Sequence, residues 1–461
     1  MVNNLRSRIL LGSGANGLGL LARVATQLLI VPILLSAWSV PLYGEWLLIS
    51  AIPIYLSLSD MGFVSAGSNE LARRSQDGVT RESQSFYTDY VSTFASWSTL
   101  LLLFFVGIVF VAPVDEWLEL ELISRQEARI VFAFLIAHVL LSQNSLTIHA
   151  GLRACHRAHV AFLLRAASAI CQTVVIAFLV LAFGAGPIGV AIATAGVRLA
   201  EVCLLAILSH RNGLTPRWRV FKRPNEPMWS YLTIGLEFML LPLSQAIVLQ
   251  GMVIMIGTTL GPVAVAAFST HRTLTRMTSQ VVQLAVTPLR AEAGLLQGEE
   301  QRPKLLRLVL RLSRMTFWAS LIIAVALMVF GHWIFKIWTH GNIAFLPMVF
   351  FPLLLTTILE GVWRVPAAVR FGTNQHRPLV WSYFVLSLLG VAFAYFLGRI
   401  WGLNGVGYAL VCIDGMMCIL TIHYNSTLLR VEAGSFVRSI LTPPIADIAY
   451  LIDLLKRRNS R

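Results

Sequence analysis

Apolar segments long enough to cross a bilayer recur along the whole chain. A transmembrane α-helix needs about 20 predominantly apolar residues. Segments of that length lie at about 9–37, 42–69, 90–112, 128–150, 159–183, 187–209, 229–256, 263–289, 315–336, 345–369, 379–400 and 404–426. In hydrocarbon, a helix is the simplest element that satisfies its own backbone polar groups. The sequence therefore predicts an all-α polytopic membrane protein with about 12 transmembrane helices.

The composition and the placement of charge agree with this class. Hydrophobic residues make up 57% of the chain, charged residues only 13%, and the mean hydropathy is +0.73. The net charge of +14 comes from basic residues in short segments between apolar runs, so we expect no nucleic-acid partner. By the positive-inside rule these segments face the cytoplasm. We expect a multi-pass membrane protein with both termini cytoplasmic and an acidic outer loop at 113–127.

Neither the N-terminus nor the cysteines and histidines indicate another class. The first apolar run is too long for a signal-peptide core and reads as an uncleaved first helix. The five cysteines show no C-x-x-C spacing, and the ten histidines show no spacing typical of metal ligands. We expect no disulfide framework, no metal site and no cofactor.

Two similar segments indicate an internal repeat. Gly186–Ala193 and Gly402–Ala409 share the pattern G-x-x-G-V-x-x-A, and each opens a predicted helix. Pro41 and Pro262 likewise precede the second and the eighth helix. Because each repeat holds an even number of helices, the two lobes are parallel copies, a plan typical of alternating-access transporters. We expect a monomer with two parallel six-helix lobes around a central cavity.

The predicted domains follow from this repeat. They are an N-terminal lobe (1–209), a basic cytoplasmic linker (210–228), a C-terminal lobe (229–426) and a cytoplasmic tail (427–461). In the tail, apolar residues recur at helical spacing from Ile445 to Leu455, ahead of Lys456-Arg457-Arg458. This pattern predicts an amphipathic helix on the inner leaflet, held by anionic lipids. A docking surface for a partner protein is the alternative.

Arginines within the apolar spans are the main clue to function. Arg272 and Arg276 lie in a polar stripe on the eighth helix that also contains Ser269, Ser279 and Gln283. A guanidinium at the bilayer centre costs roughly 2.5 to 3.5 kcal/mol even on the lenient insertion scale, so the pair needs an anion or a wet cavity.

The first helix carries a comparable stripe. Asn16, Arg23 and Gln27 share one face of it. We expect Arg23, Arg272 and Arg276 to bind an anion, since guanidinium groups form forked, charge-assisted hydrogen bonds with compact anions. Asn16, Gln27, Ser279 and Gln283 would line the same cavity.

Ion pairing is the competing interpretation of these charges. Asp60, Glu237 and Asp414 also lie within apolar spans. Each either couples transport to a proton or sodium ion or balances an arginine, as in a pair of Arg23 with Asp60 or of Arg272 with Glu237. Two further arginines have an acid at helical spacing, which predicts the local pairs Arg198 with Glu201 and Glu360 with Arg364. Arg165 lies near a helix end, from which its side chain can reach the interface.

A resemblance to a known family adds to this interpretation. The segments Tyr43-Gly44-Glu45-Trp46, Leu56–Phe63 and Asn69-Glu70-Leu71-Ala72 resemble the start of bacterial polysaccharide transporters, the Wzx-type O-antigen flippases of the multidrug/oligosaccharidyl-lipid/polysaccharide exporter superfamily. The resemblance implies two lobes in a V. It also implies movement of an undecaprenyl-diphosphate-linked oligosaccharide from the inner to the outer leaflet for O-antigen, capsule or exopolysaccharide synthesis.

The resemblance bears on site residues and partners as well. Related lipid II flippases carry cavity-facing arginines on helices one and eight, which Arg23, Arg272 and Arg276 match, so we expect these three to bind the diphosphate. The second helix here has no arginine in its span. The resemblance also implies the bacterial cytoplasmic membrane as the location. A polysaccharide polymerase and glycosyltransferases are the expected pathway partners.

Two other functions compete with a flippase. A cation-coupled multidrug exporter of the same superfamily would favour an acidic, aromatic cavity, which the arginine stripe argues against. A membrane glycosyltransferase or polymerase would need a sizeable outer segment with catalytic groups. Only 113–127 is long enough, so we do not expect an enzyme.

Overall fold

The computed structural model describes residues 2–76, 78–221, 224, 236–296, 298–445 and 447. Every regular element within these ranges is helical, which confirms the predicted all-α class. The chain forms two compact units, Met1–Ala266 (unit 1) and Ala267–Arg461 (unit 2). The division falls within the predicted eighth helix, whereas the predicted lobes meet at 210–228. The predicted lobe boundaries stay a prediction.

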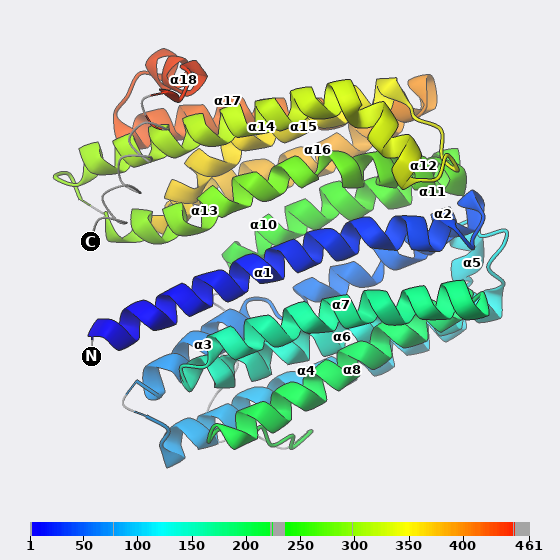
Figure 1. Ribbon diagram of the computed structural model, residues 1–461, viewed down its shortest axis with the longest axis horizontal. Helices are drawn as coiled ribbons and strands as arrows, with labels where there is room; N and C mark the ends of the chain where they lie inside the picture. Colours follow the sequence, from blue (N-terminus) through cyan, green and yellow to red (C-terminus); the bar gives the residue numbers. More distant parts are fainter. Residues whose placement is uncertain are drawn as a thin grey trace. The chain divides into compact units, whose positions relative to one another are not determined.

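Five long helices run side by side in unit 1 (Figure 1). They are α1 (Val2–Leu35), α4 (Arg81–Val111), α6 (Arg125–Ala154), α7 (Ala158–Phe183) and α8 (Pro187–Arg211). Helix α6 packs against both α4 and α8, and α1 packs against α7. The core of this unit includes the fully buried aromatic rings of Phe86, Tyr87 and Tyr90 on α4.

Local sequence signals account for where these helices begin and end. At the start of α6, the Ser124 hydroxyl accepts the Glu127 N–H and the Glu127 carboxylate accepts the Ser124 N–H, a capping box that satisfies two unpaired helix-end donors. Helix α7 is followed directly by Gly184 with φ +61°, a left-handed conformation that glycine adopts without strain. Helix α8 begins at Pro187, whose missing N–H costs nothing in the first turn.

The predicted second helix (42–69) is interrupted, so its continuity was predicted wrongly. It consists of α2 (Val40–Ala51), the 3₁₀ helix η1 (Pro53–Leu58) and α3 (Phe63–Arg74). Pro53 opens η1, and the chain turns sharply at Met61 (φ +44°) and Gly62 (φ +80°). At the break, the Ser59 carbonyl accepts a hydrogen bond from Trp97 and the Ser57 carbonyl accepts one from Gln143.

Unit 1 also contains the seventh predicted helix. Its described part comprises α10 (Leu236–Ala246), a π-helical turn η2 (Ile247–Gly251) and α11 (Met252–Leu260). Helix α10 packs against η1, and α11 packs against α2, where the Leu48 side chain lies in contact range of Gly257. Residues 222, 223 and 225–235 lie outside the described residues, and these include part of the predicted linker (210–228).

Five helices form the body of unit 2 (Figure 1). They are α13 (Met277–Leu295), α14 (Arg302–Trp338), α15 (Pro347–Gly372), α16 (Arg377–Trp401) and α17 (Leu403–Leu429). Helix α15 packs against α13, α14 and α17, and α16 packs against α17. Helix α12 (Pro262–Thr275) begins in unit 1 and continues into unit 2.

A short helix, α18 (Ala433–Leu441), follows α17 and packs on α14 through buried Phe436 and Ile440. The sequence pattern did not predict it. Beyond α18, Asp447 is buried and its carboxylate accepts hydrogen bonds of 3.0 Å from Arg311 and from Arg314 on α14. The helix predicted from Ile445 to Leu455 falls largely outside the described residues.

Both repeated segments open helices, as predicted. Gly186 immediately precedes α8 and Gly402 immediately precedes α17. Their backbones differ, because Gly402 has φ +58° and reverses the chain directly after α16, whereas α7 ends three residues before Gly186. The repeated sequence thus begins a helix at both places, although the turn that precedes the helix differs.

Ten helices of the described part are long and apolar enough to cross a membrane. The described side chains of α1 include the apolar stretch Leu21–Leu35, and the eighth predicted helix is divided into α12 and α13. The chain is a multi-pass membrane protein.

Candidate functional site

The arginine stripe of the predicted eighth helix lies at an interruption of that helix. Helix α12 ends at Thr275 and α13 begins at Met277, with Arg276 (φ −67°, ψ −8°) between them. The Arg276 N–H still donates to the Arg272 carbonyl at 3.0 Å, and its own carbonyl accepts from the Ser279 N–H at 3.0 Å. The helix therefore forms one tighter, 3₁₀-like turn at Arg276 and remains hydrogen-bonded there.

Arg276 and Ser279 lie beside a carboxylate on α15. The Ser279 hydroxyl donates to Glu360 Oε2 at 2.6 Å, and Arg364 Nη2 donates to Glu360 Oε1 at 3.1 Å. This geometry confirms the predicted Glu360–Arg364 pair. Arg276 interacts electrostatically with both members of it. One glutamate thus connects the polar stripe of α12 and α13 to α15.

Asp414 on α17 belongs to the same group of charges. Its Oδ1 accepts a 2.9 Å hydrogen bond from Trp363 Nε1, and it interacts electrostatically with Glu360, Arg364 and Arg276. The Arg364 guanidinium lies 5.4 Å from the centroid of the Trp363 ring, a cation–π contact. We call Arg272, Arg276, Ser279, Glu360, Trp363, Arg364 and Asp414 the unit 2 cluster.

The rest of the predicted stripe is divided between this cluster and the surface. Arg272 lies 5.2 Å from the Phe268 ring centroid and interacts electrostatically with Arg276, and Ser269 is buried nearby on α12. Gln283 on α13 is exposed. Ser279 is therefore bound within the cluster, while Gln283 is not buried with it.

Arg23 lies on an exposed face of α1 in unit 1. Its Nε donates to the Gly19 carbonyl at 3.2 Å, and Gln27, one turn further on, is also exposed. The ion pair of Arg23 with Asp60, the competing prediction, is not among the ion pairs of the described residues. Arg23 and the unit 2 cluster lie in different units, so a shared diphosphate site stays a prediction.

Two further arginines lie near Arg23 in unit 1. Arg165 on α7 interacts electrostatically with Arg23, with Arg198 and with Glu201. Arg198 donates a hydrogen bond to Glu201, which confirms the predicted pair on α8. This group of described residues contains three arginines and one glutamate. It is therefore more basic than the spacing of Arg198 and Glu201 on α8 alone indicated.

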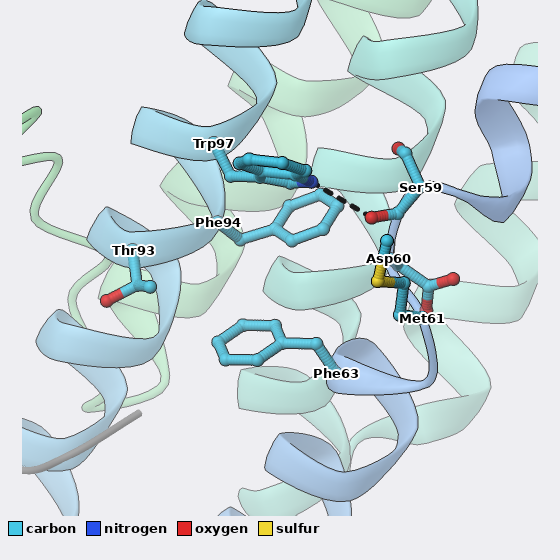
Figure 2. A pocket seen from close by; sticks show the side chains of 7 residues that line it. All are labelled: Ser59, Asp60, Met61, Phe63, Thr93, Phe94 and Trp97. Atoms are coloured by element: carbon cyan, nitrogen blue, oxygen red, sulfur yellow. Dashed lines mark hydrogen bonds between the residues drawn. The ribbon is translucent and has the colours of Figure 1, made fainter. Parts of the chain in front are cut away.

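Asp60 lies beside an apolar cavity of about 230 Å³ (Figure 2). Trp97, Phe94 and Phe63 contribute their rings to the wall, and Trp97 Nε1 donates to the Ser59 carbonyl at 2.9 Å. In Figure 2 the Asp60 carboxylate points away from these rings, and the Asp60 backbone carbonyl accepts a hydrogen bond of 2.7 Å from the Phe63 N–H. Asp60 therefore holds the start of α3 at the break.

Two predicted site residues cannot be placed by their side chains. Asn16 lies in α1 and Glu237 in α10, but both side chains fall outside the described part. Sequence reasoning also missed members of the unit 2 cluster as site residues: Glu360, Trp363 and Arg364. Their spacing on one apolar helix was the available signal. No group of metal-ligating side chains occurs among the residues described.

The segment Tyr43–Trp46 supports the backbone around it. Glu45 is fully buried, and its carboxylate accepts three backbone hydrogen bonds of 2.8 Å, from Glu121, Leu122 and Ile123 of the predicted outer loop. At Gly44, an added Cβ would overlap the Pro262 carbonyl at the start of α12.

The last residue of this segment, Trp46, packs against an aromatic side chain outside it. Trp46 packs edge-on against Trp38, with 5.7 Å between ring centroids. Trp38 Nε1 in turn donates to the Ala185 carbonyl at 2.9 Å.

The segment Asn69–Ala72, which also carries the family resemblance, contains a compact charge network. Glu70 accepts hydrogen bonds from Arg73 at 2.7 and 2.9 Å and from Arg74 at 2.7 Å. The hydrogen bond from Arg73, with that from Arg74, lowers the pKa of Glu70 to about 2. Glu70 therefore remains anionic at neutral pH and is already paired.

Comparison with solved structures identifies the helix arrangement. A crystal structure of a MATE point mutant has a TM-score of 0.67 with this chain at 17% identity, over 92% of this chain and 96% of its own. An inward-facing multidrug resistance MATE family transporter of the MOP superfamily has a TM-score of 0.68 at 17% identity, over 89% and 94%. This chain has the MATE fold. No family model and no curated protein matches the sequence.

The MATE fold also occurs with a different kind of pocket. A MOP superfamily transporter from Pyrococcus furiosus has a TM-score of 0.61 with this chain at 16% identity, over 92% of this chain and 95% of its own. Its binding pocket is described as having reverse polarity, suggestive of a different function. At these identities the likeness shows the MATE fold alone.

Proposed function

We propose that this chain is a transporter that moves an undecaprenyl-diphosphate-linked oligosaccharide from the inner to the outer leaflet of the bacterial cytoplasmic membrane. Alternating access would carry the substrate across for polysaccharide biosynthesis. The MATE fold and the resemblance to Wzx-type flippases support the transporter class. The observation that carries the choice of substrate is the arginine-rich unit 2 cluster.

The charge balance of the unit 2 cluster favours an anionic substrate. The arginines Arg272, Arg276 and Arg364 outnumber the carboxylates Glu360 and Asp414. Arg364 has its own hydrogen-bonded acid, and the Arg272 and Arg276 guanidinium groups lie within electrostatic range of each other. Like charges held together away from water are costly. A diphosphate would relieve that cost through forked hydrogen bonds.

An export assay with substituted arginines tests this proposal. Arg272→Ala and Arg276→Ala should each reduce polysaccharide export severely while protein level and membrane insertion stay normal, because removal of a cation eases insertion and weakens anion binding. Lys replacements should be partly active, since they keep the charge and lose the fork. Arg290→Ala removes an exposed arginine of α13 and serves as the control. Full export by the Arg272→Ala/Arg276→Ala double variant would refute the assignment.

Asp414 balances charge in this proposal and does not couple an ion. An inside-negative potential favours outward movement of an anion by about 2.3 kcal/mol per charge per 100 mV, so the membrane potential alone can drive transport. Asp414→Asn keeps an oxygen that can accept the Trp363 hydrogen bond. We expect this variant to retain voltage-driven transport in reconstituted vesicles. Transport that requires a sodium or proton gradient at zero potential, and that Asp414→Asn abolishes, would assign Asp414 to coupling.

A cation-coupled multidrug exporter is the second candidate function. The cavity lined by Phe63, Phe94 and Trp97 next to Asp60 favours it, since aromatic rings and a carboxylate suit a lipophilic cation. The direction of the carboxylate, away from the rings in Figure 2, argues against it. Drug-resistance assays in cells that express the protein separate the two: an exporter raises resistance to cationic drugs and a flippase does not.

A further inference from the structure

A second cavity in unit 1 has a polar end and an apolar wall. It has a volume of about 370 Å³ and lies where the ends of α3 and α6 meet the start of α7. None of the arginines assigned above to the diphosphate lines it. The residues around it are Val64, Ser65, Ser68, Asn69, Leu146, His149, Ala150, Arg153, Ala158, Ala161 and Phe162.

Helical spacing brings these residues to one place. Leu146, His149 and Arg153 recur at intervals of three and four along one face of α6. Ala158 and Ala161 near the start of α7 have small side chains and leave room opposite that face. The cavity is therefore a product of three helix faces and not of a loose loop.

The polar end of the cavity carries Arg153, which forms no ion pair with an acid in the part of the chain described. Arg153 Nη1 donates to the Ser68 hydroxyl at 3.4 Å, and Nη2 donates to Asn69 Oδ1 at 3.1 Å. Both acceptors are neutral. The closest acid along α3, Glu70, is paired with the next two arginines of its own helix. The charge of Arg153 thus remains available to an anion.

His149 adds an unused hydrogen-bonding group to the same wall. Its Nε2 is buried and has no hydrogen-bond partner within the part of the chain described, which is costly unless a ligand or water supplies one. Arg165 and Arg198 lie within electrostatic range of this ring. The surroundings of His149 are therefore positive and suit an acceptor oxygen.

The geometry points to a binding site for a terminal phosphate group, with the phosphate oxygens between Arg153 and His149. Ser68 can donate to the same oxygens, and basic pockets between membrane helices bind lipid headgroups in this way. Phe162, 37% exposed on the open side of α7, lines the apolar wall. A membrane lipid or free phosphate can supply this group. The inference does not depend on the proposed transport function.

A displacement assay on the full-length protein in detergent tests the site. A fluorescent short-chain phosphatidate is bound and then displaced by dioctanoyl phosphatidate, by dioctanoyl phosphatidylcholine or by inorganic phosphate. Arg153→Gln keeps polar contacts to α3 and removes the charge, so it should weaken phosphatidate binding at least about tenfold. His149→Leu should weaken it as well. Arg157→Gln removes an exposed arginine just outside the cavity and should leave binding unchanged.

Each outcome discriminates. Phosphatidate that displaces far better than inorganic phosphate identifies a lipid as the source, and equal displacement identifies free phosphate. Displacement by phosphatidylcholine as strong as by phosphatidate would overturn the proposal, because only the chains would then bind. The same conclusion would follow if Arg153→Gln behaved like Arg157→Gln.

Discussion

Replacement of Glu45 by glutamine should release the outer loop from α2. The two oxygens of the carboxylate accept three backbone N–H groups at 2.8 Å, two at Oε1 and one at Oε2. A glutamine has one carbonyl oxygen, so at least one N–H would face an NH₂ group, and the remaining bonds would lose their charge assistance. Hydrogen bonds to charged groups are worth about 1.5 to 3 kcal/mol each, so we expect a loss of about 2 to 4 kcal/mol.

Amide hydrogen exchange measures this loss where it occurs. A loss of about 2 to 4 kcal/mol in local stability corresponds to exchange that is roughly 30- to 700-fold faster at the amides of Glu121, Leu122 and Ile123. Glu121→Gln is the matched control, because its side chain is exposed and its backbone N–H is kept. Exchange in Glu45→Gln no faster than in Glu121→Gln would show that the carboxylate does not hold the loop.

Two further predictions concern the tail and the topology. Asp447→Asn should weaken the attachment of the tail to the two arginines of α14 by about 1 to 3 kcal/mol and speed amide exchange in α18; unchanged exchange would contradict the role of the ion pairs. In a cysteine-free background, Ser124→Cys should react with an impermeant thiol reagent from outside and Asn212→Cys should not. The reverse labelling would overturn the predicted orientation.

The class of the fold could be predicted because hydropathy over about 20 residues decides whether a segment spans a membrane. The interruptions were harder. Pro53 and Gly62 signal a possible break, yet the apolar pattern continues on both sides of them. At Arg276 the sequence offers no proline or glycine, and the backbone tightens for a single residue. A periodicity averaged over a whole span cannot detect so short a change.

The candidate site separates in the same way into local and distant contacts. The Glu360–Arg364 pair follows from helical spacing and could be predicted. The hydrogen bonds from Ser279 to Glu360 and from Trp363 to Asp414 join different helices. They depend on the rotation and depth of each helix within the bundle, which the pattern of one helix does not determine.

The contacts of Tyr43–Trp46 bear on how such segments should be used to assign function. Gly44 allows close approach to Pro262, Glu45 anchors an outer loop, and Trp46 packs on Trp38. None of these contacts involves the arginines proposed to bind the substrate. A new sequence that contains this segment would therefore be recognised as sharing a joint between helices, and its cargo would have to be inferred from other positions.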